Sequence, residues 1–240
     1  YKTYNMNWLS KFLTSSIGRK LIMSLTGIFL ILFLIVHLIG NLQLLVDDGG
    51  ETFNLYAYMM THNPFIKTVS WGLYFFILLH TVQGLLLARK NRSAKGSRYA
   101  VNSNKTSWAS KNMALLGILI FAFMCMHMGD FWYKMKFTDQ LSTFDVDGYS
   151  DPVKDLYTQV KTSFGVWWVV LIYLIGVLAL AVHLKHGFQS AFQTLGLNHK
   201  KYTPLIQRLG SFYSFVVPFG FVIIPIIYFG DAQGWWSWFS

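Results

Sequence analysis

The chain has 240 residues, of which 54% are hydrophobic, 18% aromatic and only 12% charged, and its formal net charge is +10. This composition is far from the average of soluble globular proteins and is typical of integral membrane proteins. It argues against a water-soluble protein and for a chain whose solvent is the lipid bilayer.

Five apolar stretches are long enough to cross a membrane, which takes about 20 helical residues. All five are predicted to be helices, because an open structure of another kind leaves its backbone polar groups unsatisfied in lipid. The first is of full spanning length, so we expect it to stay as an anchor and not to be a cleaved signal peptide. The sequence therefore predicts an all-α integral membrane protein, with one five-helix transmembrane domain over residues 1–240. The predicted spans are about 21–46, 65–88, 112–133, 164–195 and 205–229.

Charged residues are segregated between the two sides of this predicted bundle. The segment before the first span and the loops 88–111 and 185–208 carry fifteen of the twenty Lys and Arg residues and no acid, whereas all ten carboxylates lie on the other side. Lys and Arg near helix ends stay on the cytoplasmic side. We therefore expect the N-terminus inside and the C-terminus outside. The basic face favours an acidic or anionic-lipid-coated soluble partner, and nucleic acid is a poor candidate.

Five of the seven histidines lie inside or at the ends of predicted spans. A single histidine there could be a hydrogen-bonded core residue, but four different helices each carry one. Ionisable groups are costly in a membrane, usually face the bundle interior, and mark an ion path or a cofactor. The five are His37, His80, His127, His183 and His186.

Depth along the helices sorts these histidines into two levels. His80 and His186 each lie nine residues, or about 13 Å, from the predicted helix end on the basic side, and His183 lies about one turn deeper. His37 and His127 lie about 24 to 26 Å from that side. A bis-histidine haem needs two imidazoles at one level on neighbouring helices. The sequence therefore predicts an inner pair, His80 with His186, and an outer pair, His37 with His127.

Haem iron suits these sites better than zinc or copper, because no thiolate or carboxylate cluster accompanies the imidazoles. Cys125 is the single cysteine, which excludes a disulfide framework and a covalent c-type haem motif. Four glycines lie within four residues of the histidines, where they would let a flat macrocycle approach or serve close helix packing. They are Gly40, Gly84, Gly129 and Gly187.

Three stretches that contain these histidines resemble the cytochrome b subunit of succinate dehydrogenase and fumarate reductase. They are "SSIGRKLIMSLTGIFLILFLIVHLIGNLQL" (15–44), "FFILLHTVQGLLLARK" (75–90) and "HLKHGFQSAFQTLGLNHKKYTPLI" (183–206). The chain is most similar to the five-helix, single-subunit, two-haem type of Bacteroidetes and other menaquinone users, from about Ser15 to the last span. The resemblance implies that the ligands are His37, His80, His127 and His186, the same four that depth selects, with His183 as the alternative inner ligand.

The resemblance also implies a place in the bacterial cytoplasmic membrane and two soluble partners, a flavoprotein subunit and an iron–sulfur subunit. Those partners interconvert succinate and fumarate, and two haems b connect the iron–sulfur chain to menaquinone near the outer surface. This chain would be enzymatic for the quinone half-reaction alone. Some two-haem fumarate reductases carry a proton-conducting glutamate two residues before the fourth-helix ligand, where this chain has Leu184, or Ala181 if His183 is the ligand. That difference predicts no such proton path and favours succinate oxidation.

The sequence defines the sites for quinone and for the haem propionates less sharply. A quinone site needs a polar group that exchanges protons near the outer haem, and propionates need hydrogen-bond donors. For each candidate, a solvated loop charge or a side chain reaching the membrane surface is the simpler role. The quinone candidates are Gln43, Asp47, Asp48, Glu51, Tyr56, His62 and Asp130, and the propionate candidates are Arg19, Lys20, Ser24, Arg89 and Lys90.

Two other functions fit part of the pattern. A di-haem b subunit of a hydrogenase or formate dehydrogenase would show similar histidines and would co-purify with a nickel or molybdenum partner. A transporter with a histidine proton relay would bind no haem. The spans lack the buried carboxylates and the pair of Pro-broken helices that such transporters carry, since Pro218 and Pro225 share the last helix. Near the outer surface, residues 53–60 form either a short interfacial helix or a plain loop.

Overall fold

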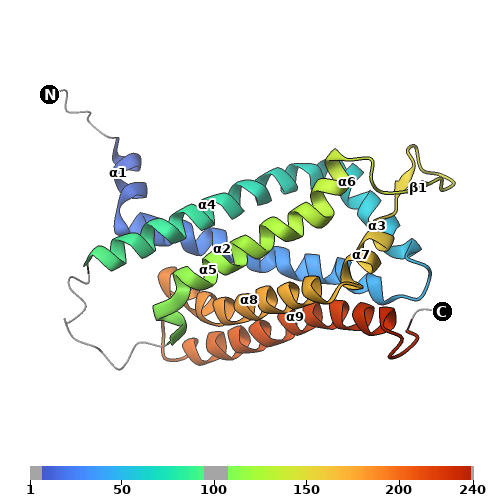
Figure 1. Ribbon diagram of the computed structural model, residues 1–240. Coiled ribbons are helices and arrows are strands. Elements are labelled where there is room, and N and C mark those ends of the chain that lie inside the picture. The colour runs from blue at the N-terminus through green and yellow to red at the C-terminus, as the bar shows by residue number, and fades with distance from the viewer. Residues whose placement is uncertain (1–6, 95–107, 239–240) are drawn as a thin grey trace.

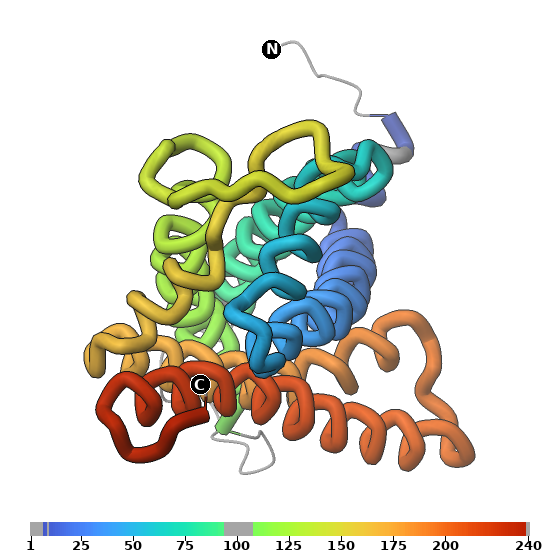
Figure 2. Tube along the Cα trace, turned by 90° about the vertical axis from the view of Figure 1, so that its right-hand side faces the viewer, coloured from blue at the N-terminus to red at the C-terminus, as the bar shows by residue number. Residues whose placement is uncertain are grey.

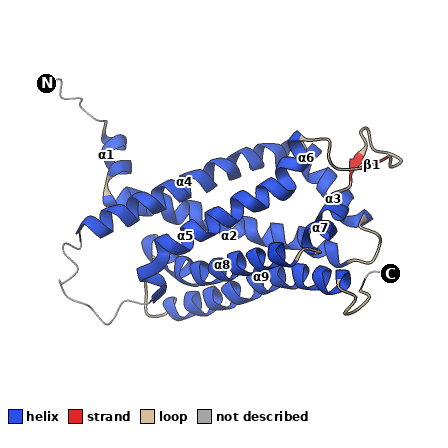
Figure 3. Cartoon of the chain, in the orientation of Figure 1, coloured by secondary structure: helices blue, strands red, loops and turns tan. Residues whose placement is uncertain are grey.

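The computed structural model describes residues 7–94 and 108–238. Five long helical stretches of 28 to 30 residues dominate this part of the chain, and each is long and apolar enough to cross a bilayer. The prediction of an all-α chain with five helices that are long and apolar enough to span a membrane is therefore confirmed (Figure 3). The main helices are α2 (Ser16–Leu42), α4 (Pro64–Ala94), α5 (Trp108–His127), α8 (Trp167–Thr194) and α9 (Thr203–Ala232).

All five helices run lengthwise through the bundle in the view of Figure 1, and the turned view of Figure 2 shows that α8 and α9 are inclined to the other three. Helix α8 packs against α9, α5 and α2, and α2 also packs against α4. Figure 2 shows the same bundle turned by 90°, with α8 and α9 side by side at the bottom. We call the end where α4 ends and α5 begins the basic end. The opposite end, covered by α3, α6 and α7, is the loop end.

The starts of α2 and α9 show two ordinary signals of a helix N-terminus, a side-chain cap and an early proline. The short helix α1 (Trp8–Thr14) is followed by Ser15, whose Oγ accepts a hydrogen bond of 3.0 Å from the Gly18 backbone N–H and so caps α2. Helix α9 begins with a proline in its first turn and continues through Pro218 and Pro225. Such prolines are tolerated in membrane helices because neighbouring groups satisfy the freed backbone positions.

Short elements form the loop end. Helix α2 continues into the 3₁₀ turn η1 (Gln43–Leu45), and α5 continues through the π-helical segment η2 (Met128–Tyr133) into α6 (Lys134–Phe137). Two strands, β1 (Thr143–Phe144) and β2 (Val153–Lys154), pair antiparallel with Thr143 opposite Lys154. Helix α3 (Glu51–His62) covers the region where the sequence left a helix or a loop open.

Helix α7 (Leu156–Phe164) separates the outer loop from the fourth membrane span. The predicted span begins at Phe164, but in the structure Val166 is extended, with φ −102° and ψ 116°, and α8 begins at Trp167. Phe164 before this bend and Val169 after it both belong to the same buried cluster. The sequence is therefore apolar on both sides of the bend. A change of direction between two buried helices leaves no polar signal in the sequence.

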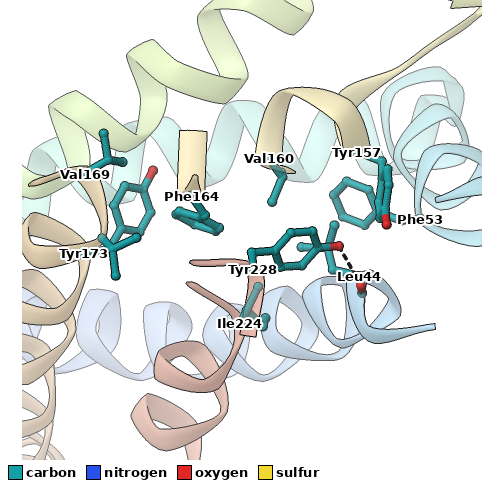
Figure 4. Close-up of a cluster of buried hydrophobic side chains, with 10 residues drawn as sticks. Leu44, Phe53, Tyr157, Val160, Phe164, Val169, Tyr173, Ile224 and Tyr228 are labelled. Atoms are coloured by element: carbon teal, nitrogen blue, oxygen red, sulfur yellow. Dashed lines mark hydrogen bonds between the residues drawn. The ribbon is translucent and has the colours of Figure 1, made fainter. Parts of the chain in front are cut away.

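A cluster of buried hydrophobic side chains lies toward the loop end, where η1, α3, α7, α8 and α9 meet (Figure 4). At its centre Tyr228 is 1% exposed and donates a hydrogen bond of 2.7 Å to the Leu44 carbonyl. This bond satisfies a carbonyl at the end of the first span, where the helix leaves its last acceptors unpaired. Figure 4 labels Leu44, Phe53, Tyr157, Val160, Phe164, Val169, Tyr173, Ile224 and Tyr228.

Candidate functional site

A cavity of about 2720 Å³ lies inside the bundle and is lined mainly by α2, α4, α5 and α8. Pockets for drug-sized ligands measure about 300–1,000 Å³, so this one has room for bulkier groups. Its walls are largely apolar, and the polar side chains among them include the five span histidines that the sequence singles out. They are His37, His80, His127, His183 and His186.

The predicted outer pair meets inside this cavity. The ring centroids of His37 on α2 and His127 at the end of α5 lie 5.8 Å apart, with ring planes at 85°. Phe33 stacks on the His37 ring at 5.2 Å, and Phe131 lies 5.5 Å from the His127 ring. Two helices that are distant in the sequence therefore present imidazoles to one another within an aromatic surround.

A second pair lies nearer the basic end. The ring of His80 on α4 lies 6.3 Å from the ring of His183 on α8, at an angle of 63°. His186, one turn further along α8, lines the same cavity and is half-buried. The structure thus brings the alternative inner residue opposite His80, and the ligand role of His186 stays a prediction.

The ends of the two helices explain why depth counting favoured His186. Arg89 is the predicted end of the second span, but α4 is still helical at Ala94, the last described residue before the gap. His80 therefore lies at least fourteen residues before the end of α4, whereas His183 lies eleven and His186 eight before the end of α8. Basic residues mark the membrane surface and not the last helical residue. Counting from them therefore cannot fix the relative depth of histidines on two helices to within one helical turn.

Hydrogen bonds orient three of the rings through Nδ1. His80 Nδ1 lies 3.0 Å from Thr26 Oγ1, and His127 Nδ1 lies 3.3 Å from the Tyr173 hydroxyl. Asn41 Nδ2 lies 3.3 Å from His37 Nδ1 and donates to the His37 carbonyl at 2.7 Å. A metal-ligating imidazole commonly donates its second ring N–H to an acceptor, which fixes the ring and its tautomer. The hydroxyl oxygens of Thr26 and Tyr173 can accept in this way from His80 and His127. The Asn41 amide nitrogen only donates, so His37 Nδ1 is the acceptor in that contact.

The residues present fit haem groups by their donor set and by the space around it. Each pair presents two imidazoles at a separation compatible with one metal ion between them, given metal–nitrogen bonds of about 2.0–2.1 Å. The buried Nδ1 of His183 has no hydrogen-bond partner among the described residues. Within the same residues, no group of three or more His, Cys, Asp or Glu side chains forms an alternative metal centre.

The glycines near the histidines separate into two kinds. A Cβ at Gly40 would meet the Tyr56 ring at 2.5 Å, and one at Gly84 would meet Met23 at 3.1 Å, so these two serve helix packing. A Cβ at Gly129 would meet nothing within 4 Å. Gly27, which the sequence analysis missed, lies against His80, because a Cβ there would be 3.3 Å from Cε1 of that ring.

Of the seven quinone candidates, only Tyr56 lines the large cavity. His62 stacks on Tyr58 at 3.8 Å and lines a separate surface pocket, and Asp130 pairs with Lys134 at 3.8 Å. The other candidates that lie off the cavity wall are Gln43, Asp47, Asp48 and Glu51.

A cavity contact at the loop end was missed by the sequence analysis. Trp132 Nε1 donates a hydrogen bond of 2.7 Å to the Tyr74 hydroxyl, and both residues line the cavity. Aromatic residues are too frequent in these spans for the sequence to single out this pair.

Two carboxylates at the loop end hold turns and are not part of the cavity. Burial raises the pKa of Asp155, but hydrogen bonds from Thr158, Asn54 and Ser142 outweigh it, so that the pKa lies below its usual range. For Asp48, burial again raises the pKa, and hydrogen bonds from Thr52 and Gly50 lower it overall. Both groups therefore stay ionised at neutral pH and act as caps.

At the basic end, the propionate candidates also divide. Arg19 Nε donates to the Thr14 carbonyl and Lys90 Nζ to Ser16 Oγ, so these two connect local elements. The other three candidates line the cavity, and two further cations that the sequence does not single out also line it. The cavity residues are Lys20, Ser24 and Arg89, with Arg92 and Lys111 in addition.

Comparisons of the chain with protein-family models, with curated proteins and with solved structures found no match.

Proposed function

We propose that this chain is the di-haem cytochrome b subunit of a succinate dehydrogenase or fumarate reductase in the bacterial cytoplasmic membrane. It would anchor a flavoprotein subunit and an iron–sulfur subunit and exchange electrons with menaquinone. The observation that supports this most directly is the occurrence of two facing histidine pairs on different helices around one cavity. The resemblance of the histidine-containing segments to that family agrees with it.

In this proposal His37 and His127 hold the outer haem, and His80 holds the inner haem together with His183 or His186. Bound haem iron supplies a one-electron carrier whose potential depends on its axial ligands and on burial. The protein orients the imidazoles through Thr26 and Tyr173. The walls of the cavity are largely apolar.

The segregation of charge supports the orientation and the choice of soluble partners. The basic end would face the cytoplasm, as basic flanking residues generally do. Cations such as Lys20, Arg89 and Arg92 line the cavity there, where they are suited to anionic haem propionates. The rest of the basic surface is suited to acidic faces of the flavoprotein and iron–sulfur subunits.

Menaquinone would react near the loop end, which carries all the acids of the chain. Tyr56 is the sequence candidate that supports this most, because it lines the cavity beside Gly40. Helix α8 contains no Asp or Glu, and the position two residues before His186 is the buried Leu184. The proposal therefore includes no proton path through the fourth span, and favours succinate oxidation.

A visible spectrum of the purified membrane protein tests the proposal. Dithionite-reduced minus oxidised spectra, with haem quantified per chain, are expected to give two b-type haems. A correctly folded protein without haem would overturn the proposal.

The partners test a separate part of it. The complex purified from its native membrane is expected to contain flavin and iron–sulfur clusters and to reduce a menaquinone analogue with succinate. Co-purification of nickel or molybdenum in place of flavin would assign the chain to a hydrogenase or formate dehydrogenase.

A further inference from the structure

Thr26 on α2 faces the imidazole of His80 on α4 across the helix interface. Its Oγ1 lies 3.0 Å from His80 Nδ1, and the residue is 4% exposed. The same Oγ1 lies 2.8 Å from the Ile22 carbonyl and 3.2 Å from the Met23 carbonyl. One hydroxyl in a buried position is therefore within hydrogen-bond distance of two carbonyls and one ring nitrogen.

The single hydroxyl proton decides the direction of these bonds. A carbonyl oxygen only accepts, so the Thr26 proton must point to a carbonyl for that contact to be a hydrogen bond. Oγ1 can then only accept from His80, which requires a hydrogen on Nδ1. The opposite arrangement, with the hydroxyl donating to Nδ1, would leave the carbonyl contact unmade. Both contacts are satisfied only when His80 carries Nδ1–H and, being neutral, keeps a lone pair on Nε2.

A neighbouring residue limits the ring position independently. A Cβ at Gly27 would lie 3.3 Å from His80 Cε1, so only glycine leaves the ring its present distance from α2. Thr26 and Gly27, which are consecutive on α2, thus supply a hydrogen-bond acceptor for His80 and the space beside its ring. The other inner histidine has no such support, because His183 Nδ1 lacks a partner among the described residues.

We infer that Thr26 is a positioning residue for the inner haem, because it holds His80 in the Nδ1–H tautomer with Nε2 free to bind iron. This inference rests on the proposed function. A hydrogen bond from Nδ1–H raises the basicity of the ligating nitrogen, and loss of such a partner typically costs 10–100-fold in metal affinity. Greater basicity also favours ferric over ferrous iron. Removing the bond should therefore raise the midpoint potential of one haem.

The test compares three variants in the purified haem-containing protein. Thr26→Val removes the hydroxyl at nearly constant volume, and Thr26→Ser restores it. Thr81→Val is the matched control, because Thr81 follows His80 on α4 and donates to the Ile77 carbonyl at 2.9 Å. It removes an equivalent hydroxyl on the helix of the ligand itself. The readouts are the midpoint potentials of both haems and the retention of haem against an excess of apomyoglobin.

We expect Thr26→Val to raise the potential of one haem and to weaken its retention by about 10-fold or more, while Thr26→Ser and Thr81→Val resemble the wild type. Unchanged values in Thr26→Val, or an equal shift in Thr81→Val, would overturn the inference and leave two haems and the proposed function in place. A wild-type protein without haem would instead overturn the proposed function. If Thr26→Val does not accumulate in membranes, Thr26→Ala gives the same comparison with a better helix former.

Discussion

Asn54 on α3 donates a hydrogen bond of 2.9 Å from Nδ2 to Asp155 Oδ1, although 101 residues separate the two in the sequence. The Oδ1 atom of Asn54 accepts from the backbone N–H groups of Leu156 and Tyr157, also at 2.9 Å. One amide therefore completes the first turn of α7, where helical N–H groups have no partner of their own. This arrangement joins α3 and α7, two of the three helices that cover the loop end.

Replacing Asn54 by alanine is expected to destabilise the protein by about 1–3 kcal/mol, because it leaves backbone N–H groups unsatisfied at a position that is 2% exposed. Thermal unfolding of the detergent-solubilised protein measures the effect. Asn198→Ala is the control, since Asn198 is exposed and its hydrogen bond from Thr203 Oγ1 is 3.3 Å long. Equal losses in the two variants would argue against a structural role for the buried amide.

Acid is expected to weaken the loop end through Asp155. The pKa of Asp155 is lowered in the folded state by hydrogen bonds that outweigh the effect of burial. Such a group contributes stability above its unfolded pKa of about 4, and this contribution is lost as the pH falls through the lower folded pKa. Melting temperatures measured from pH 7 down to pH 3 should fall less steeply in Asp155→Asn than in the wild type. Parallel curves would assign the acid sensitivity to other carboxylates.

Much of the fold is predictable from the sequence, because a bilayer demands long apolar helices and leaves few alternatives. The five spans follow from this rule alone. Tertiary contacts determine where the helices bend and how far they extend. The bend at Val166 lies within a continuous apolar pattern, and the extension of α4 to Ala94 lies beyond the basic residues that mark the membrane surface.

The candidate site is predictable in part for the same reason. Histidines are conspicuous in apolar spans, so the four helices that carry them can be selected and the outer pair matched. Thr26 and Gly27 are not conspicuous, because hydroxyl residues and glycines serve general packing in membrane helices. Their relation to His80 depends on the rotation of α2 against α4, which the sequence does not encode in any one residue.

The proposed outer haem site predicts that His37→Ala and His127→Ala lose the same haem. Their rings face each other at 5.8 Å, whereas the His80 ring belongs to the other pair. Potentiometric titration should show that both variants lack one component and that His80→Ala lacks the other. If His37→Ala and His127→Ala instead affected different components, the two residues would not share a haem.

The inner ligand can be assigned by comparing His183→Ala with His186→Ala. Because the ring of His183 faces His80 at 6.3 Å and His186 is half-buried one turn away, we expect His183→Ala to lose the inner haem and His186→Ala to retain it. Haem content and the spectrum of the remaining haem distinguish the outcomes. Loss of the inner haem in His186→Ala alone would support the assignment that the sequence favours.

In the proposed function, Gly27→Ala should disturb the inner haem without removing any of its proposed ligands. Its new Cβ would lie 3.3 Å from His80 Cε1, so the ring must shift by a few tenths of an ångström. Misplaced ligands bind more weakly, and we expect a shifted midpoint potential for one haem and faster haem loss. Gly72→Ala on α4 is the matched control, because a Cβ there would meet nothing within 4 Å and alanine is the better helix former. An unchanged potential in Gly27→Ala would mean that His80 does not bind iron in the position seen here, since an iron-bound ring in that position could not accept the methyl group without moving.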